Sequence, residues 1–246
     1  MSKQFSISRQ VFFQGLIQLL SIPYIYISHW FSLPNKSNYR SKVEYQLPFE
    51  GEWTVINGGT EKEFSHSWGV PTQRYAYDFV IMDNDGKTYQ GERADKHSYY
   101  CYSKNILAPA DGVVAAIGNK CADSTPFGDE KVELNAKDIR GNYILIKHAE
   151  KEYGFIGHIK PESIQVEVGQ TVHKGEVIAK CGNTGNTSEP HIHFHLQDEV
   201  GFFTSAGLPI LFRDINVLKQ DGYLNYDNRP VLDTIMLTEN GQHINR

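Results

Sequence analysis

The clearest pattern along the chain is an alternation of histidines and apolar residues near its last quarter. The alternating residues are His191, Ile192, His193, Phe194, His195 and Leu196. Successive side chains of a β-strand point to opposite faces, so the pattern predicts a strand with an apolar face toward a core and an imidazole face opposite. Three imidazoles on one face are costly to bury without a role, and neutral imidazole is the commonest metal ligand. The strand is therefore predicted to contribute to a metal or catalytic site, against the alternative that each histidine is structural.

Short β-rich runs bounded by Gly, Asn, Asp and Pro fill the chain from position 53 to position 197. Because no helical periodicity separates them, the pattern predicts a mainly β fold, an antiparallel sandwich or open barrel. The predicted strands are 53–56, 75–82, 113–117, 143–148, 153–158, 177–181 and 191–197. The long polar stretch 118–140 is interpreted as an insertion that forms one wall of a substrate groove.

The N-terminal segment contains no Asp, Glu, Lys or Arg between positions 10 and 35. Its apolar run approaches the roughly 20 residues that a membrane span needs. Gln10, Gln14 and Gln18 recur at every fourth position and form a polar stripe, and Pro23 interrupts the run. Segment 1–34 is therefore predicted to be an apolar helix, and the sequence leaves open a membrane anchor or an amphipathic helix packed on the domain or lying on a membrane. Any membrane association is expected to involve residues 5–31, and the lack of an A-x-A-like site disfavours a cleaved signal peptide.

Composition divides the rest of the chain and excludes some functions. The polar stretch 35–48 is interpreted as a linker, 49–212 as the β domain and 213–246 as a C-terminal extension. A net charge of −5 gives no basic footprint, so we expect no nucleic-acid partner. The three cysteines, Cys101, Cys121 and Cys181, form no C-x-x-C pair, which argues against a cysteine zinc site or a disulfide framework.

Further motifs accompany the histidine strand, and their order along the chain is informative. They occupy segments 108–114, 141–148, 157–159, 168–172 and 182–194, the last of which contains Gly-Asn-Thr-Gly followed by Pro-His-x-His-Phe. Together they resemble the lysostaphin-type (LytM-like) zinc endopeptidases, in that family's order, from about position 65 to position 197. The resemblance implies a duplicated-hybrid-motif fold, a β-rich open barrel with a narrow groove, and a zinc ion held by two histidines and one aspartate.

The resemblance also implies residue roles, carried over by matching position. His193 becomes a zinc ligand and Asp78 the carboxylate ligand, while His191 and His158 become the catalytic histidines. His195 stands where the family more often has Glu or Gln, and its role is left open between a neighbour that supports the metal site, a rival ligand and an ordinary polar residue.

The first metal histidine is where this sequence departs from the family. Its usual position, four residues before Asp78, holds Arg74, which stays protonated and cannot ligate zinc. His66, twelve residues before Asp78, is predicted to replace it as the third ligand.

The implied function is a zinc-dependent endopeptidase that hydrolyses peptide bonds in peptidoglycan stem or cross-bridge peptides at the cell envelope, membrane-anchored or exported. Three protein ligands leave a coordination position for water, and zinc brings the pKa of such a water toward about 7. His158 and His191 would then transfer protons. Arg74 motivates the alternative, a catalytically degenerate relative that binds cell-wall peptide or regulates a partner hydrolase. A phosphotransfer or carrier domain of the same fold is a weaker alternative, because Pro-His-x-His-Phe occurs together with Asp78.

Overall fold

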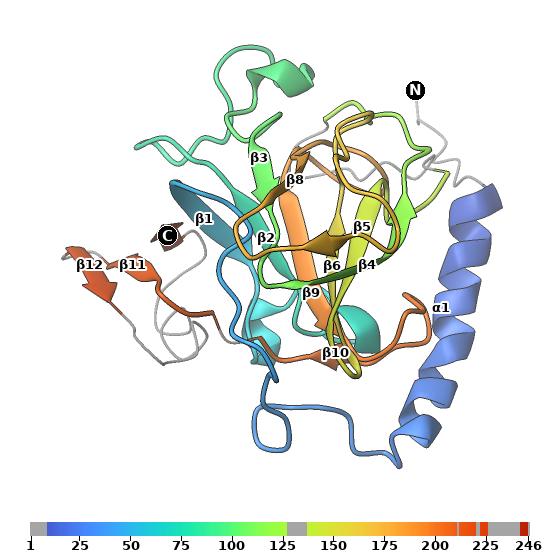
Figure 1. The fold of residues 1–246 in the computed structure, drawn as a ribbon. Coiled ribbons are helices and arrows are strands. Elements are labelled where there is room, and N and C mark those ends of the chain that lie inside the picture. Colours follow the sequence, from blue (N-terminus) through green and yellow to red (C-terminus); the bar gives the residue numbers. More distant parts are fainter. Residues whose placement is uncertain (1–8, 127–136, 211, 220–221, 226–241, 246) are drawn as a thin grey trace.

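The computed structural model describes residues 9–126, 137–210, 212–219, 222–225 and 242–245, and its architecture is mainly β (Figure 1). A long open sheet follows the order β12-β11-β13-β1-β2-β9-β6-β5-β4-β7, with β10 paired to β9, and β3 and β8 form a separate pair. Every pairing between these named strands is antiparallel. The predicted mainly β, antiparallel fold is therefore confirmed, as an open sandwich-like arrangement rather than a closed barrel.

The strand boundaries show where sequence patterning succeeded. The strands are β1 Glu52–Asn57, β2 Tyr77–Val80, β3 Asn105–Leu107, β4 Gly112–Gly118, β5 Tyr143–Ala149, β6 Glu152–Gly157, β7 Thr171–Val172, β8 Val177–Lys180, β9 Ile192–Gln197, β10 Gly207–Leu208, β11 Asn216–Lys219, β12 Gly222–Asn225 and β13 Gln242–Asn245. All seven predicted strands occur, with ends shifted by a few residues. The alternation pattern did not find β3, β7 and β10, because two or three residues are too few to display a period.

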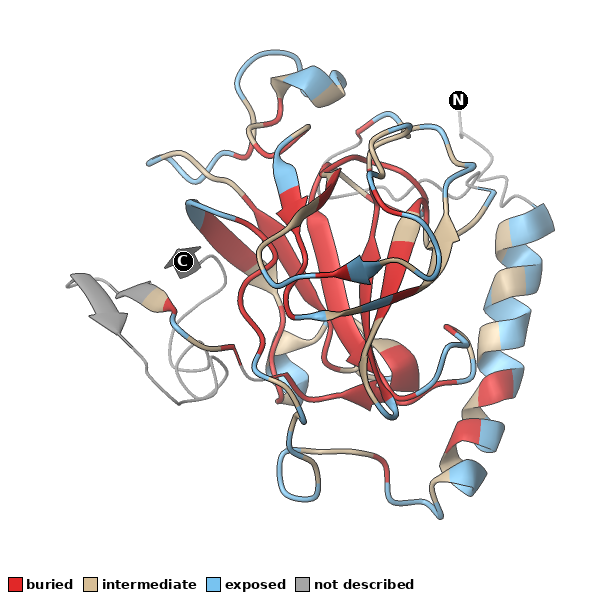
Figure 2. Cartoon of the chain, in the orientation of Figure 1, coloured by how far each residue is buried: buried red, intermediate tan, exposed pale blue. Residues whose placement is uncertain are grey.

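The hydrophobic core lies between the long sheet and the β3–β8 pair. The apolar face of β9, formed by Ile192, Phe194 and Leu196, is fully buried there. Ile106 of β3 and Ile178 of β8 belong to the same buried cluster. Burying one such side chain stabilises the fold by roughly 1.5–3 kcal/mol, so this face fixes β9 firmly at the centre of the molecule. Figure 2 shows the buried residues concentrated along these central strands.

Helix α1, Arg9–Ser28, lies along one side of the β structure and confirms the predicted apolar helix. Its inner side makes a few contacts: Gln14 Oε1 accepts a hydrogen bond from the Ile139 amide at 2.9 Å, and Ile25 is buried. Just beyond the helix, His29 Nε2 lies 2.7 Å from Asp198 Oδ2. The polar stripe expected from the sequence therefore faces the domain at Gln14.

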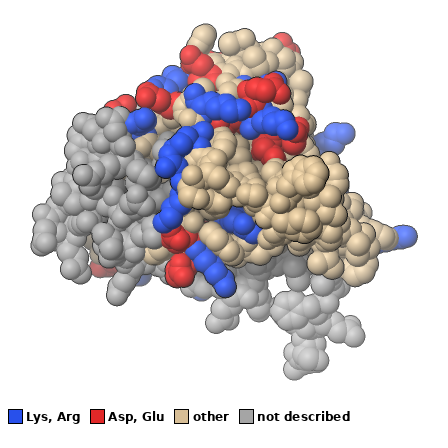
Figure 3. All heavy atoms as spheres, turned by 90° about the horizontal axis from the view of Figure 1, so that it is seen from below, with Lys and Arg blue, Asp and Glu red and all other residues tan. Residues whose placement is uncertain are grey.

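The outer side of α1 is apolar and exposed. Its exposed residues are Phe12, Phe13, Leu16, Ile17, Leu19, Leu20, Tyr24 and Ile27, and Trp30 and Phe31 follow the helix. Seen from below, charged side chains of both signs are interspersed over much of the molecule, whereas the side on which α1 lies is largely uncharged (Figure 3). By length and composition the helix is long and apolar enough to cross a membrane.

The stretch 35–48, interpreted from sequence as a linker, follows the surface of the domain and ends inside its core. Tyr45 is fully buried, and its hydroxyl donates a hydrogen bond to Glu152 Oε1 at 2.7 Å. The Glu152 carboxylate also accepts hydrogen bonds from the Tyr39 hydroxyl and, at 2.9 Å, from the Lys42 amide. One buried carboxylate thus ties this stretch to β6. The proposed division of the chain into segments stays a prediction, and residues 211, 220–221, 226–241 and 246 of its C-terminal part lie outside the described residues.

We expect Glu152→Leu to lower the free energy of unfolding by about 2–4 kcal/mol, because it leaves buried donors, including the Tyr45 hydroxyl, without an acceptor. Urea unfolding followed by fluorescence measures this change. Glu150→Leu is the matched control: the Glu150 side chain is 79% exposed, and its replacement should change the unfolding free energy by no more than about 0.5 kcal/mol. Equal effects of the two variants would contradict the assigned role of Glu152.

Candidate metal and catalytic site

Strand register places the predicted site residues next to one another. β9 lies between β2 and β6, and His193 is directly opposite both Asp78 of β2 and Gly157 of β6. His158 follows Gly157 immediately, and His191 immediately precedes β9. Because the register of a half-polar strand is set by its buried apolar face, packing of the β9 core face aligns the imidazoles with Asp78.

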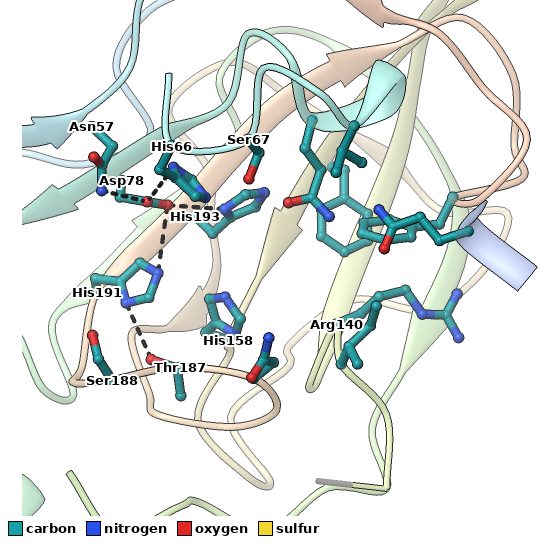
Figure 4. Close-up of a pocket in the computed structure, with 17 residues that line it drawn as sticks. Asn57, His66, Ser67, Asp78, Arg140, His158, Thr187, Ser188, His191 and His193 are labelled. Carbon is teal, nitrogen blue, oxygen red and sulfur yellow. Dashed lines mark hydrogen bonds and ion pairs between the residues drawn. The ribbon is translucent and has the colours of Figure 1, made fainter. Parts of the chain in front are cut away.

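These side chains line a pocket of about 540 Å³ (Figure 4). Its walls come from β1, β2, β6 and β9, from the segments around positions 66–73, 139–140 and 186–188, and from α1. The lining residues are Gln18, Asn57, His66, Ser67, Val70, Gln73, Asp78, Ile139, Arg140, Phe155, His158, Asn186, Thr187, Ser188, His191, His193 and Phe202. The pocket therefore contains all five residues for which the sequence predicted catalytic or metal-binding roles.

Asp78 is the centre of the site. Its Oδ1 lies 2.9 Å from His193 Nδ1 and 3.5 Å from His191 Nε2, and its Oδ2 lies 3.3 Å from His66 Nδ1. Asn57 Nδ2 donates a hydrogen bond to Oδ2 at 3.2 Å. Burial alone would raise the pKa of this carboxyl, but the neighbouring His66 and His191 hold the pKa well below its ordinary value. The site therefore contains one buried, ionised carboxylate surrounded by imidazoles.

His158 and His191 are each oriented by a backbone carbonyl. His158 Nδ1 donates to the Thr184 carbonyl at 2.7 Å, and His191 Nδ1 donates to the Glu189 carbonyl at 2.8 Å. The two rings lie 4.6 Å apart between centroids. Since each Nδ1 is used as a donor, His158 Nε2 is left to exchange a proton or bind a ligand, whereas His191 Nε2 lies 3.5 Å from Asp78 Oδ1.

The environments of these two histidines push their pKa values in opposite directions. Burial, followed by the neighbouring His191 and His193, holds the pKa of His158 well below its ordinary value. Burial also acts to lower the pKa of His191, but the Asp78 carboxylate outweighs it and raises that pKa to about 9. At neutral pH the pair thus offers one neutral imidazole, able to accept a proton, and one imidazolium, able to donate one.

Two closely packed glycines fix the backbone at Thr184, whose carbonyl accepts the hydrogen bond from His158. Gly141 and Gly185 both have positive φ angles, 67° and 87°. A Cβ atom added to Gly141 would lie 2.2 Å from the Thr184 carbonyl oxygen, so this position accepts no side chain. His158 itself has φ 58°, a left-handed conformation that costs a non-glycine residue about 1–3 kcal/mol and is typical of functional sites.

A buried chain of hydrogen bonds runs from His193 away from the pocket. Gln197 Nε2 donates to the Glu199 carbonyl at 2.6 Å, which turns the Gln197 Oε1 acceptor toward His195 Nε2 at 3.0 Å. His195 must therefore carry its proton on Nε2, and its Nδ1 accepts from His193 Nε2 at 3.0 Å. The chain sets the tautomer of His193 and leaves His193 Nδ1 with a lone pair directed at Asp78. His195, whose role the sequence left open, is thus a positioning residue for His193.

This arrangement fits a bound metal ion. Burial lowers the pKa of His193 and lowers that of His195 well below its ordinary value, so both rings are neutral at pH 7. The lone pair on His193 Nδ1 and a lone pair on Asp78 Oδ1 then face each other across 2.9 Å. Two lone pairs at that distance repel unless a cation lies near both, and imidazole nitrogen with carboxylate oxygen is a donor set that zinc accepts. His66, on the far side of the carboxylate, offers a third donor.

A second combination of donors overlaps the first. Side-chain nitrogens of His158, His191 and His193 all lie within 4.8 Å of one another, so these three also could hold a metal ion. Both triads share His193 and differ in the other two residues. The assignment of His66, Asp78 and His193 as ligands, with His158 and His191 as the catalytic pair, stays a prediction.

Arg74, which the sequence analysis singled out, lies outside this pocket: its Nε donates to the Trp68 carbonyl at 3.3 Å. Conversely, no motif pointed to Asn57, which donates a hydrogen bond to Asp78 and lies one residue beyond a predicted strand. The stretch 118–140 contributes Ile139 and Arg140 to the pocket wall, and its residues 127–136 lie outside the described part of the chain.

Comparison with known families supports this description. Residues 99–202 match the family model of Peptidase family M23. This segment of the chain is thus similar to the M23 peptidases. The resemblance to the lysostaphin-type peptidases is thereby confirmed. The M23 match includes His158, His191 and His193, whereas His66 and Asp78 precede it, so the carboxylate half of the candidate site is supported by geometry alone.

Two curated relatives match shorter stretches. An uncharacterized metalloprotease of Haemophilus influenzae is 37% identical over 89 residues, which cover 36% of this chain and 15% of that protein. The cell division protein DipM of Caulobacter vibrioides is 29% identical over 92 residues, which cover 37% of this chain and 12% of that protein. This chain therefore matches less than a sixth of the length of either relative.

Among solved structures, the catalytic domain of lysostaphin from Staphylococcus simulans is similar to this chain with a TM-score of 0.34 and 17% identity. That similarity covers 70% of this chain and 90% of the lysostaphin domain.

The two possible ligand triads make opposite predictions for zinc content. If His66, Asp78 and His193 hold the ion, His66→Ala should lose bound zinc and His158→Ala should keep one equivalent. If the three clustered histidines hold it, the two variants should behave the other way round. Atomic absorption on purified proteins measures the stoichiometry, with His193→Ala as the variant expected to lose zinc in both cases and His173→Ala, whose side chain is 78% exposed, as the variant expected to keep it.

The hydrogen-bond chain predicts a further difference in zinc affinity. His195→Asn places an amide oxygen near the position of Nδ1 and should bind zinc within a few-fold of the native protein. His195→Leu removes the acceptor and should weaken zinc binding by about 10–100-fold. Competition with a chromophoric chelator measures both constants, and equal weakening by the two substitutions would show that His195 acts through packing alone.

Proposed function

We propose that this protein is a zinc-dependent endopeptidase that hydrolyses peptide bonds in the stem or cross-bridge peptides of peptidoglycan. The observation that carries the proposal is a donor set suited to zinc, built around Asp78, in the same pocket as two further imidazoles of opposite protonation preference. The M23 match of residues 99–202 supports the reaction class. The substrate class follows from the resemblance to lysostaphin-type peptidases.

The metal would be held by His66, Asp78 and His193. Bound there, zinc would supply a Lewis acid that polarises a carbonyl and lowers the pKa of water. Asn57 holds the Asp78 carboxylate in place by a hydrogen bond to Oδ2. Gln197 and His195 hold His193 in the tautomer that presents Nδ1 to the metal.

His158 and His191 would carry out the proton transfers. His158, kept neutral by burial, accepts the proton of the attacking water at Nε2, with its Nδ1–H anchored on the Thr184 carbonyl. His191 would donate a hydrogen bond from Nε2 to the developing oxyanion or a proton to the leaving amine. Proton transfer of this kind contributes typically 10²–10⁴-fold to the rate, and oxyanion stabilisation adds to it.

The proposed function places the protein at the cell envelope. Peptidoglycan lies outside the cytoplasmic membrane, and α1 has the length and apolar outer face of a membrane-associated helix. α1 also contributes Gln18 to the candidate site, so membrane attachment through this helix would hold the pocket close to the bilayer.

A second candidate function is a non-catalytic relative that binds cell-wall peptide or regulates a partner hydrolase. His66 favours it, because this side chain is 37% exposed and belongs to a spacer longer than the family's. If His66 is held less firmly, metal binding would be weaker. The pocket could then bind peptide without hydrolysing it.

The deciding experiment is release of soluble peptide from purified peptidoglycan by the zinc-loaded protein. Native protein should release peptide, and His158→Ala should retain zinc while losing at least about 10²-fold in turnover, because it lacks the proton acceptor. His173→Ala, at an exposed histidine away from the pocket, should be fully active. Zinc-loaded protein that binds peptidoglycan without releasing peptide would support the non-catalytic alternative instead, and unchanged turnover of His158→Ala would refute its assignment.

A further inference from the structure

A second pocket, of about 500 Å³, lies beside the candidate site. Segment 66–75 contributes to both pockets: Ser67, Val70 and Gln73 line the first, and Trp68, Arg74 and Tyr75 line the second. The rest of the second pocket comes from the end of α1, the stretch that follows it and the residues after β1. Its lining is Tyr26, Phe31, Ser32, Leu33, Asn35, Lys36, Ser37, Thr60, Glu61, Trp68, Arg74 and Tyr75.

Arg74 is held in this pocket as an oriented cation. Its Nε donates to the Trp68 carbonyl at 3.3 Å, and its Nη2 donates to the Tyr26 hydroxyl at 3.1 Å. The guanidinium carbon lies 5.1 Å from the centroid of the Trp68 ring. A guanidinium has five N–H donors, so these two contacts fix its plane and leave further donors for a ligand.

The charges that line the pocket do not balance. Lys36 and Glu61 form an ion pair with each other. Arg74 is half-buried, and no carboxylate of the described residues forms an ion pair with it. One positive charge is therefore uncompensated in a partly enclosed space, which favours a ligand with a single negative charge.

The other side-chain donors of the pocket are less available than Arg74. Thr60 lines the pocket, but its hydroxyl oxygen is buried. The hydroxyl of Tyr75 is already committed, because it donates to the Pro34 carbonyl at 2.9 Å. Arg74 is thus the donor that a ligand would use, and a carboxylate offers two acceptor oxygens that match the planar fork of a guanidinium.

We propose that this pocket is a substrate-recognition site that binds a free carboxylate of the peptide through Arg74. The proposal rests on the proposed function, since it takes the ligand to be a peptide that extends from the first pocket across segment 66–75. It also accounts for the residue at position 74: where the family usually has a metal histidine, this chain has an arginine that serves the substrate instead. The longer spacer places His66 in the first pocket and Arg74 in the second.

The test uses binding rather than cleavage. Metal-free full-length protein is titrated calorimetrically with N-acetyl-tetra-alanine and with its C-terminal amide, two peptides that differ in the carboxylate. Native protein should prefer the acid by at least about tenfold, the worth of one charge-assisted hydrogen-bonded pair. Arg74→Gln should abolish the preference, and Arg74→Lys should keep part of it, because lysine retains the charge without the planar fork.

His173→Ala serves as the control, because His173 is 78% exposed and lines neither pocket, so the preference for the acid should be unchanged. Equal affinity for acid and amide, no binding of either, survival of the preference in Arg74→Gln, or its loss in His173→Ala would each overturn the proposal. The Arg74→Lys variant keeps the test decisive if Arg74→Gln fails to fold. A preference for the acid in a protein that releases no peptide would sustain this site and refute the endopeptidase function, so the two failures are distinguishable.

Discussion

The candidate site depends on one buried carboxylate. Asp78 is only 5% exposed, yet its pKa is held well below the ordinary value because His66 and His191 lie beside it. Asn57 also donates a hydrogen bond to this carboxylate. Its closest contact, with His193, brings together two lone pairs, since the hydrogen-bond chain through His195 and Gln197 commits the proton of His193 to its other nitrogen. A cation relieves that repulsion. The metal hypothesis therefore follows from donor chemistry and does not depend on a motif alone.

The fold delivers this arrangement through strand register. The apolar residues of β9 pack into the core between the two sheets, and this packing fixes which residues of β2 and β6 lie beside His193. A register shift of one residue on β9 would turn His193 into the core and Phe194 into the pocket. Core residues such as Phe194 therefore position the site by setting the strand register.

Sequence patterning predicted much of this arrangement, because the relevant signals are local. The alternation at 191–196 predicts a strand and its two faces. The motifs on either side of it carry the resemblance to the lysostaphin-type peptidases. Asn57 escaped prediction because nothing near it in the sequence shows that β1 pairs with β2, and hydrogen bonding between His195 and Gln197 is visible only once both side chains are placed. The roles within the histidine cluster follow from distances rather than from patterns, and two ligand triads remain compatible with those distances.

The two pockets give the departure at Arg74 a physical meaning. A spacer that brings His66 to Asp78 also turns Arg74 toward Trp68 and Tyr26, away from the candidate site. The central claim remains that Asp78 and His193 hold a metal ion, and anomalous diffraction at the zinc edge from zinc-loaded crystals tests it most directly. We predict one anomalous peak at about 2.0–2.2 Å from His193 Nδ1, an Asp78 oxygen and a His66 nitrogen. A peak bound by His158 and His191 instead, or no peak in this pocket, would contradict the account.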